Sequence, residues 1–118
     1  MNTASLELCR ELYELSGWLC KYGWFGQYTG EELGYQVLVR SEYEINASYQ
    51  CPAYELGYLL RKLPPYTRVW FNKKSWVCSQ GGGGAEDNAS EYADTPEDAV
   101  AKLAIELFKQ GILERTKK

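Results

Sequence analysis

The first apolar stripe at helical spacing lies near the start of the chain. Leu8, Leu12 and Leu15 occupy positions i, i+4 and i+7, while glutamate and arginine side chains fill the opposite side. Gly17 follows this stripe, and glycine is the residue that most often ends a helix in the left-handed conformation. We therefore expect an amphipathic helix over residues 5–16.

Two further segments show the same spacing. A stripe of leucines within residues 53–63 starts after Pro52, which suits the first turn of a helix, and ends at a pair of prolines. In residues 96–110, valine, leucine and phenylalanine recur every three or four positions after Thr95, whose hydroxyl can cap the first turn. Both segments are predicted to be helices.

Patterns typical of strands lie between these helices. Residues 35–41 contain a short run of valine and leucine that suggests one strand. Residues 66–71 and 75–79 are rich in aromatic and β-branched side chains and are separated by a polar turn, which predicts a β-hairpin. Residues 91–93 can resume the same sheet. The remainder of residues 18–50 is broken by glycines and shows no sustained period.

These elements predict an α+β fold class, with one small antiparallel sheet packed against about three helices in a single domain over residues 1–118. A chain of 118 residues and 13.5 kDa has room for one modest core. Four consecutive glycines indicate a flexible loop over residues 80–90, and residues 114–118 are expected to form a short polar tail.

The composition excludes several kinds of chemistry. The sequence contains no histidine, which removes the usual general base and the commonest zinc ligand. Its four cysteines form no C-x-x-C pair, so we expect no metal site. We predict that the chain has no catalytic residues, binds no cofactor and is not an enzyme.

The start of the chain lacks the apolar core of a secretory signal, and no apolar run approaches the roughly 20 residues that cross a bilayer. We therefore expect no membrane contact and a location in the cytoplasm. In that reducing compartment the cysteines are expected to be small buried side chains rather than disulfides.

Aromatic residues are concentrated in the glycine-broken middle of the chain. Tyrosine and tryptophan are enriched at binding hot spots because they combine a large rigid surface with a polar tip. A small core has too little room for all ten tyrosines and four tryptophans, so part of this ring surface is expected to contact a partner. The rings predicted to bind a partner are Trp18, Trp24, Phe25, Tyr28 and Tyr35.

Charge is divided between two stretches, although the net charge is only -3. Residues 61–74 hold five basic residues and no acidic residue, while residues 86–98 hold six acidic residues and no basic residue. The acidic stretch begins at Glu86 and Asp87 and offers a second candidate surface for a partner.

Two alternatives remain open. Basic residues interleaved with aromatic rings suit single-stranded nucleic acid, because bases stack on rings and cations meet phosphates. The residues that carry this alternative are Arg68, Trp70, Lys73 and Lys74. A sequence pI near 5.0 disfavours it. The other alternative is a small-molecule or nucleotide-binding module, although the four glycines are not followed by the Gly-Lys-Ser/Thr of a phosphate-binding loop.

Three blocks of the sequence resemble known proteins. They are LCRELYELSGW (residues 8–18), CPAYELGYLLRKLP (residues 51–64) and ADTPEDAVAKLAIEL (residues 93–107). These blocks are similar to segments of small uncharacterised phage and prophage proteins, some of which are described as having an ABA-sandwich-like fold. The resemblance implies an α+β layer and an origin in a mobile element, and it supplies no catalytic residues.

The sequence therefore predicts a non-catalytic phage accessory protein that acts by binding. The expected partner is a host protein, such as a component of an antiviral defence system that the chain would inhibit. Nucleic acid is the less favoured partner.

Overall fold

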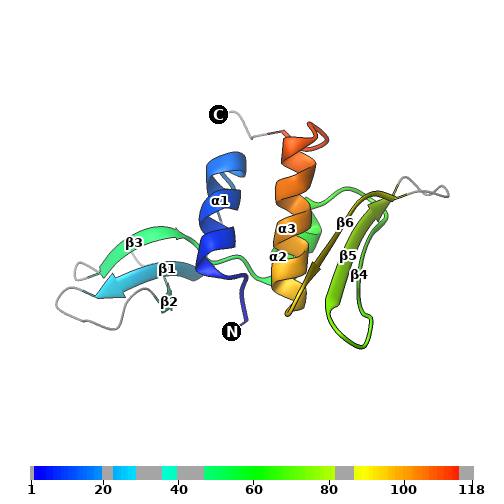
Figure 1. Cartoon of the computed structure of the whole chain (residues 1–118). Helices are drawn as coiled ribbons and strands as arrows, with labels where there is room; N and C mark the ends of the chain where they lie inside the picture. Colours follow the sequence, from blue (N-terminus) through cyan, green and yellow to red (C-terminus); the bar gives the residue numbers. More distant parts are fainter. Residues whose placement is uncertain (1, 20–22, 29–35, 40–46, 82–86, 115–118) are drawn as a thin grey trace.

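A computed structural model describes residues 2–19, 23–28, 36–39, 47–81 and 87–114 of the chain. Two antiparallel sheets of three strands each flank a layer of helices (Figure 1). The helices are α1 (Leu6–Ser16), α2 (Leu56–Lys62) and α3 (Pro96–Lys109). The strands are β1 (Gly23–Tyr28), β2 (Gln36–Val39), β3 (Ala47–Pro52), β4 (Thr67–Phe71), β5 (Trp76–Gly81) and β6 (Asp87–Ala93). The predicted α+β class is confirmed, with two sheets in place of the single expected sheet.

The first sheet has the strand order β2-β1-β3 and lies in the glycine-broken stretch. β1 pairs antiparallel with β2 on one side and with β3 on the other. The register with β3 shifts between Phe25 and Gly26, so a bulge interrupts the alternation of side chains. The strand predicted over residues 35–41 corresponds to β2, whereas β1 and β3 are strands that the sequence pattern does not indicate.

The second sheet has the strand order β4-β5-β6, and β4 and β5 form the predicted hairpin. Asn72 holds the turn between them, because its Oδ1 accepts hydrogen bonds from the backbone N–H of Lys74 at 3.1 Å and of Ser75 at 2.9 Å. An asparagine side chain that bonds the following backbone mimics a tight turn. The predicted polar turn is therefore stabilised by hydrogen bonds to the side chain of Asn72.

The prediction of an irregular loop over residues 80–90 is wrong at both ends. β5 extends through Gly81 and β6 begins at Asp87, and these two residues are opposite each other in the ladder. Pairing between the strands provides hydrogen-bond partners for the backbone groups at Gly81 and Asp87, despite the glycines that follow Gly81 in the sequence. Residues 82–86 lie outside the described residues.

α3 is buried on most of its surface because it contacts α1, α2 and all three strands of the second sheet. Its side chains Val100, Leu103 and Leu107 are fully buried. The predicted cap is present, since Thr95 Oγ1 accepts a hydrogen bond of 3.2 Å from the backbone N–H of Asp98. The helix predicted over residues 96–110 is confirmed to within one residue.

The N-terminal segment joins α1 to the connection between β3 and α2. Thr3 forms an isolated antiparallel β-bridge with Glu55. The backbone N–H of Ala4 donates a hydrogen bond of 2.9 Å to the carbonyl of Tyr54. Tyr54 is fully buried, and its hydroxyl donates to the carbonyl of Trp18 at 2.8 Å. These bonds fix the two ends of α1 to a segment far away in the sequence.

Pro52 does not begin a helix as predicted; it is the last residue of β3, an edge strand, and α2 begins four residues later at Leu56. A proline is tolerated on an edge strand because its missing N–H need not pair.

In the described part of the chain no helix has the length and apolar character needed to cross a bilayer. Cys9, Cys51 and Cys78 are buried free thiols, as predicted, and Cys20 lies outside the described residues.

Candidate functional site

The second sheet has two faces of different character. Val69, Cys78 and Ala93 point to the side covered by α3 and belong to the core or pack against it. Side chains alternate along each strand, so their neighbours point the other way. We call this opposite side the outer face. Its residues are Arg68 and Trp70 of β4, Val77 and Ser79 of β5, and Ser90 and Tyr92 of β6.

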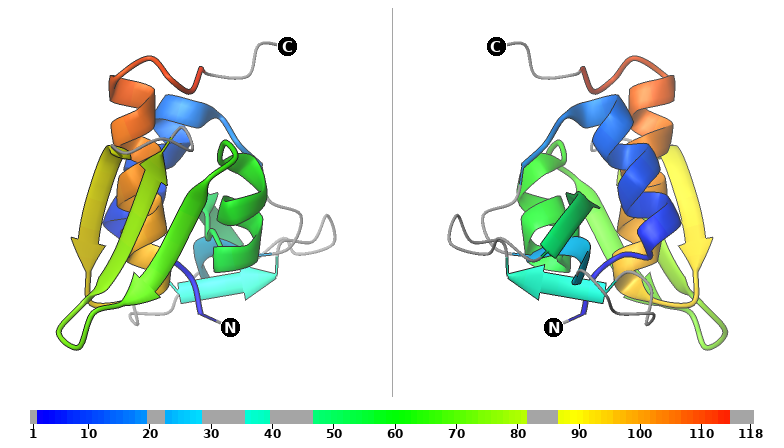
Figure 2. Two further views of the ribbon diagram at one scale, coloured as in Figure 1. Left: turned by 90° about the vertical axis from the view of Figure 1, so that its right-hand side faces the viewer. Right: turned by 90° about the vertical axis from the view of Figure 1, so that its left-hand side faces the viewer.

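Among the described elements, no helix lies over the outer face, as Figure 2 shows in its left view. A row of three side chains crosses it, because Trp70 is opposite Val77 and Val77 is opposite Tyr92. Trp70 and Tyr92 are 41% and 57% exposed, while Val77 between them is only 3% exposed. The two flanking rings therefore cover the valine, as expected for close cross-strand neighbours.

Arg68 lies on the same face, two residues before Trp70. Its guanidinium carbon is 5.7 Å from the centroid of the Trp70 ring, a cation–π distance. In the next row, the hydroxyls of Ser79 and Ser90 are hydrogen-bonded at 2.8 Å. Arg68 is the only charged residue among these six described residues of the outer face, and none of the six is acidic.

The hairpin turn adds two more cations beside this face. Lys73 and Lys74 follow Trp70 by three and four residues, and both are exposed. Lys73 has a positive φ of 81°, a conformation that is unfavourable for a lysine. Of the four residues predicted for nucleic acid, Arg68 and Trp70 therefore share the outer face, and Lys73 and Lys74 lie at its end.

The rings predicted to form an open partner surface are mostly in the core. Trp18, Trp24 and Phe25 are only 7%, 6% and 8% exposed, so the expectation of exposed rings is wrong at these positions. Tyr28 ends β1, with its side chain outside the described part, and Tyr35 lies outside the described residues.

Ring contacts explain how a small core encloses the two tryptophans. Trp24 meets Tyr13 of α1 edge-on with ring centroids 6.1 Å apart, and Trp18 contacts Phe108 of α3 at 5.3 Å. Edge-to-face and tilted pairs of this kind are favourable packing arrangements for rings. The helices therefore use these rings to attach the first sheet and the end of α1.

The acidic stretch does not form one exposed surface. Glu97 is buried, and Asp98 accepts a hydrogen bond of 2.7 Å from the backbone N–H of Ser5. Asp87 begins β6 and Glu86 lies outside the described residues. The acidic residues of this stretch therefore do not share one exposed surface.

The sequence pattern does not indicate that Tyr92 and Val77 belong to a candidate site. Tyr92 belongs to the acidic stretch of the sequence, and only the pairing of β6 with β5 brings it beside the basic hairpin. The strand signal at residues 91–93 was the available clue, because alternation from Ala93 places Tyr92 on the opposite face.

The described residues contain no group of three or more side chains suited to holding a metal ion. Burial raises the pKa of the Cys78 thiol to about 12, so this thiol stays protonated at neutral pH. A protonated buried thiol is a poor nucleophile. The side chains of the outer face offer a ligand stacking, apolar contact and cation–anion attraction.

Comparison of the chain with family models, curated proteins and solved structures finds no match.

Proposed function

We propose that this protein is a non-catalytic binding protein that holds single-stranded nucleic acid on the outer face of its second sheet. The observation that carries the proposal is the row Trp70–Val77–Tyr92, which has two exposed rings, with Arg68 beside it. Stacking of a base on an aromatic side chain contributes about 1–3 kcal/mol and tolerates any base. Each ring offers one such platform.

The spacing of the rings suits an extended strand. Trp70 and Tyr92 belong to the two outer strands of the sheet, so their Cα atoms are about 10 Å apart across two strand spacings. Two bases can therefore stack on separate rings, with Val77 as the apolar floor between them. Double-stranded nucleic acid keeps its bases paired and stacked internally and cannot use both platforms.

Charge supports an anionic partner locally, although the whole chain is acidic. Arg68, Lys73 and Lys74 supply three cations at or beside the outer face, and none of the six described residues of that face is acidic. The net charge of -3 opposes a polyanion at long range. We therefore expect weak, local binding in which about three phosphates are neutralised.

The test is the fluorescence anisotropy of labelled oligo-dT and oligo-U with increasing amounts of protein. Trp70→Ala and Tyr92→Ala should each lower the affinity roughly five-fold or more, since each removes one stacking platform. Neutralising about three phosphates should give a log–log salt slope near -2. Phe71→Ala is the matched control, because Phe71 is 55% exposed but pairs with Trp76 on the opposite face of the sheet.

Two results would overturn the proposal. One is the absence of binding at low ionic strength by a correctly folded wild-type chain. The other is equal affinity of wild type, Trp70→Ala and Tyr92→Ala, which would place any binding elsewhere.

A protein partner is the second candidate, and the composition of the outer face favours it specifically. Tryptophan, tyrosine and arginine are the residues most enriched at protein hot spots, and Trp70, Tyr92 and Arg68 provide one of each. The inhibition of a host defence protein, expected from the phage resemblance, would then use this face. In that case an oligonucleotide would not bind, whereas Trp70→Ala would weaken a purified protein complex.

We also propose a cytoplasmic location. Three buried thiols without a disulfide suit a reducing compartment, and nucleic acid is present there.

A further inference from the structure

The two edges of the second sheet differ in how their backbone groups are paired. β4 lies at one edge of this sheet and β6 at the other. In an antiparallel pair, residues that exchange hydrogen bonds alternate with residues whose backbone N–H and C=O point away from the partner strand. An edge strand therefore presents the backbone groups of every second residue outside the sheet. The candidate functions proposed above use the outer face and neither of these edges.

Two backbone hydrogen bonds fix this alternation for β4. The N–H of Gly81 donates to the carbonyl of Tyr66 at 3.3 Å, and the N–H of Asn72 donates to the carbonyl of Ser75 at 3.0 Å. Both pairs continue the register of β4 with β5. Every second residue from Tyr66 to Asn72 therefore bonds to β5, and the residues between them turn their backbone groups outward. The outward residues are Thr67, Val69 and Phe71.

The outward backbone groups of β4 are open to a partner. Within the part of the chain that the structure describes, no hydrogen bond joins the backbone of these three residues to anything beyond β5. No residue of β4 is buried, whereas β5 is buried from Val77 to Gly81. Among the described elements, β4 packs mainly on β5 and α3. Its edge therefore presents a row of three N–H donors and three carbonyl acceptors.

A lysine covers the opposite edge of the sheet. The residues of β5 that do not bond to β4 bond to β6, which leaves Ser90 and Tyr92 with outward backbone groups. Nζ of Lys102 in α3 donates a hydrogen bond of 3.1 Å to the carbonyl of Tyr92. A lysine at an edge strand hinders pairing with another chain. The second sheet therefore has one protected edge and one open edge.

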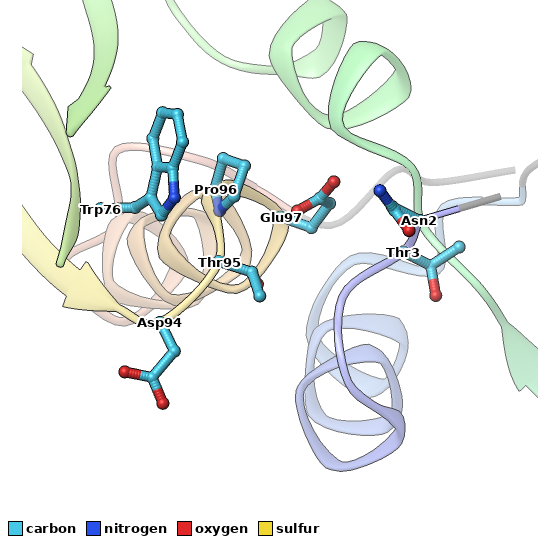
Figure 3. A pocket seen from close by; sticks show the side chains of 7 residues that line it. All are labelled: Asn2, Thr3, Trp76, Asp94, Thr95, Pro96 and Glu97. Carbon is cyan, nitrogen blue, oxygen red and sulfur yellow. The ribbon is translucent and has the colours of Figure 1, made fainter.

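An exposed ring lies beside the open edge on the side of α3. Phe71 is 55% exposed, and its ring contacts Trp76 with centroids 5.4 Å apart. Trp76 in turn lines a pocket with Pro96 at the start of α3 (Figure 3). The carboxylates of Asp94 and Glu97 in this pocket point away from the indole. This side of the edge therefore favours an apolar side chain from an added strand.

Basic residues surround the rest of the open edge. Arg68 lies on the outer face next to Val69, and Lys73 and Lys74 follow β4 in the turn. Residues 61–74, which contain all of β4, hold five basic residues and no acidic residue. A second copy of this chain at the edge would bring these cations against the same cations. Charge complementarity favours an acidic strand instead.

We propose that the open edge of β4 binds an extended acidic segment of a protein partner, which joins the second sheet as a fourth strand. When a strand is added to a sheet edge, main-chain hydrogen bonds give affinity and alternate side chains give specificity. The segment pairs with the outward groups of Thr67, Val69 and Phe71. Its side chains alternate between the side of Phe71, where they are apolar, and the side of Arg68, where they are acidic.

The test uses a capped peptide in which three glutamates alternate with two valines. Hydrogen exchange followed by NMR compares the chain with and without saturating peptide. Exchange at the N–H groups of Thr67, Val69 and Phe71 should slow at least about ten-fold, because each gains a hydrogen bond. The outward N–H of Ser90 at the other edge is the matched control and should exchange at an unchanged rate. Unchanged exchange at the three β4 positions, or equal slowing at Ser90, would overturn the proposal.

Two altered peptides separate backbone pairing from charge in the wild-type chain. N-methylation of every residue keeps the side chains and removes the N–H donors, so affinity should fall at least about ten-fold. Replacing each glutamate by lysine keeps the donors and reverses the charge, which should also lower affinity at least about ten-fold. Fluorescence anisotropy of labelled peptides measures both effects. Affinity equal to that of the parent peptide in either case would overturn the proposal.

Val69→Pro tests the edge from the side of the protein. The N–H of Val69 points outward, so proline removes one donor of the open edge and no hydrogen bond to β5. Peptide affinity should fall at least about ten-fold, whereas Val69→Thr, which keeps the N–H and the branched shape, should bind within about two-fold of wild type. Wild-type affinity in a folded Val69→Pro chain would overturn the proposal. The altered peptides give a decision even if this variant does not fold.

The chain without peptide tests the rival occupant. Slower exchange at Thr67, Val69 and Phe71 as the protein concentration rises would assign the edge to a second copy and overturn the proposal. Exchange independent of concentration supports an edge left open for a partner. None of these measurements requires an oligonucleotide, so this proposal and the outer-face proposal can fail separately.

Discussion

Single residues in this chain often differ from what their type suggests. Trp24 and Trp18 are aromatic anchors of the core, while Trp70 is exposed on a sheet face. The difference comes from the side of the element on which each ring lies, because a strand alternates its side chains between faces. Composition predicted that some ring surface is open, but only pairing could show which rings.

Cys78 provides a prediction at the scale of one residue. Burial raises its pKa to about 12, whereas the thiol of the unfolded chain ionises near pH 8.5–9. The folded state thus keeps a proton that the unfolded state releases above pH 9. The free energy of unfolding should therefore fall as pH rises from about 9 toward 12, by at most about 1.4 kcal/mol per pH unit from this group.

Urea denaturation at pH 7.5, 9.5 and 10.5 measures this effect. All other ionisable groups are the same in wild type and Cys78→Ala, so the difference between the two proteins isolates the Cys78 thiol. The fall in stability should be shallower in Cys78→Ala than in wild type. Parallel pH dependence in the two proteins would contradict the prediction.

The elements that the sequence predicts well are those with local signals. α3 has its cap, its proline and its period within fifteen residues, so its bounds follow from the sequence alone. β1 has glycines within the strand and a bulge after Phe25, which together remove the alternation on which strand prediction depends. Pro52 suits either a helix start or an edge strand, and only the position of β3 in the sheet decides between them.

The hairpin between β4 and β5 provides a prediction at the scale of an element. Lys73 has a φ of 81°, which costs a lysine about 1 kcal/mol relative to glycine. Lys73→Gly should therefore raise the free energy of unfolding by about 1 kcal/mol. The same change should weaken oligonucleotide binding, because it removes a cation from the end of the outer face.

Lys74→Gly is the matched control, since Lys74 carries the same charge as Lys73 but is not one of the described residues with a positive φ. It should weaken oligonucleotide binding similarly but give no gain in stability. Thermal melts and anisotropy titrations of both variants separate the two effects. A loss of stability in Lys73→Gly would contradict the assignment of strain.

At the scale of the whole molecule, the helices hold two sheets apart. The radius of gyration is 15.2 Å, larger than the roughly 13–14 Å of a compact chain of this length. Bonds between distant segments hold the chain beside the first sheet, such as the one that the buried hydroxyl of Tyr54 donates to the carbonyl of Trp18. Such long-range ties have no signature in the sequence, since they join residues 36 positions apart.

The attachment provides a prediction at this scale. Tyr54→Phe should lower the free energy of unfolding by about 1–3 kcal/mol, because it leaves a buried carbonyl without its donor. Tyr58→Phe is the matched control: its hydroxyl donates to the carbonyl of Leu19 at 3.1 Å in an exposed position, where water can replace it. Chemical denaturation of both variants is the measurement. An equal cost for the two changes would contradict the importance of burial.

The register of the second sheet decides both the stability of the hairpin and which side chains lie on the outer face. If β4 slipped by one residue against β5, Trp70 and Arg68 would turn inward against α3, and Val69 would turn outward to water. A slipped chain would bury a guanidinium and expose a valine that packs against the core, so it would be unstable, and Trp70 would no longer lie on the outer face. The register that gives a stable hairpin is therefore also the register that places Trp70 and Tyr92 on the same face.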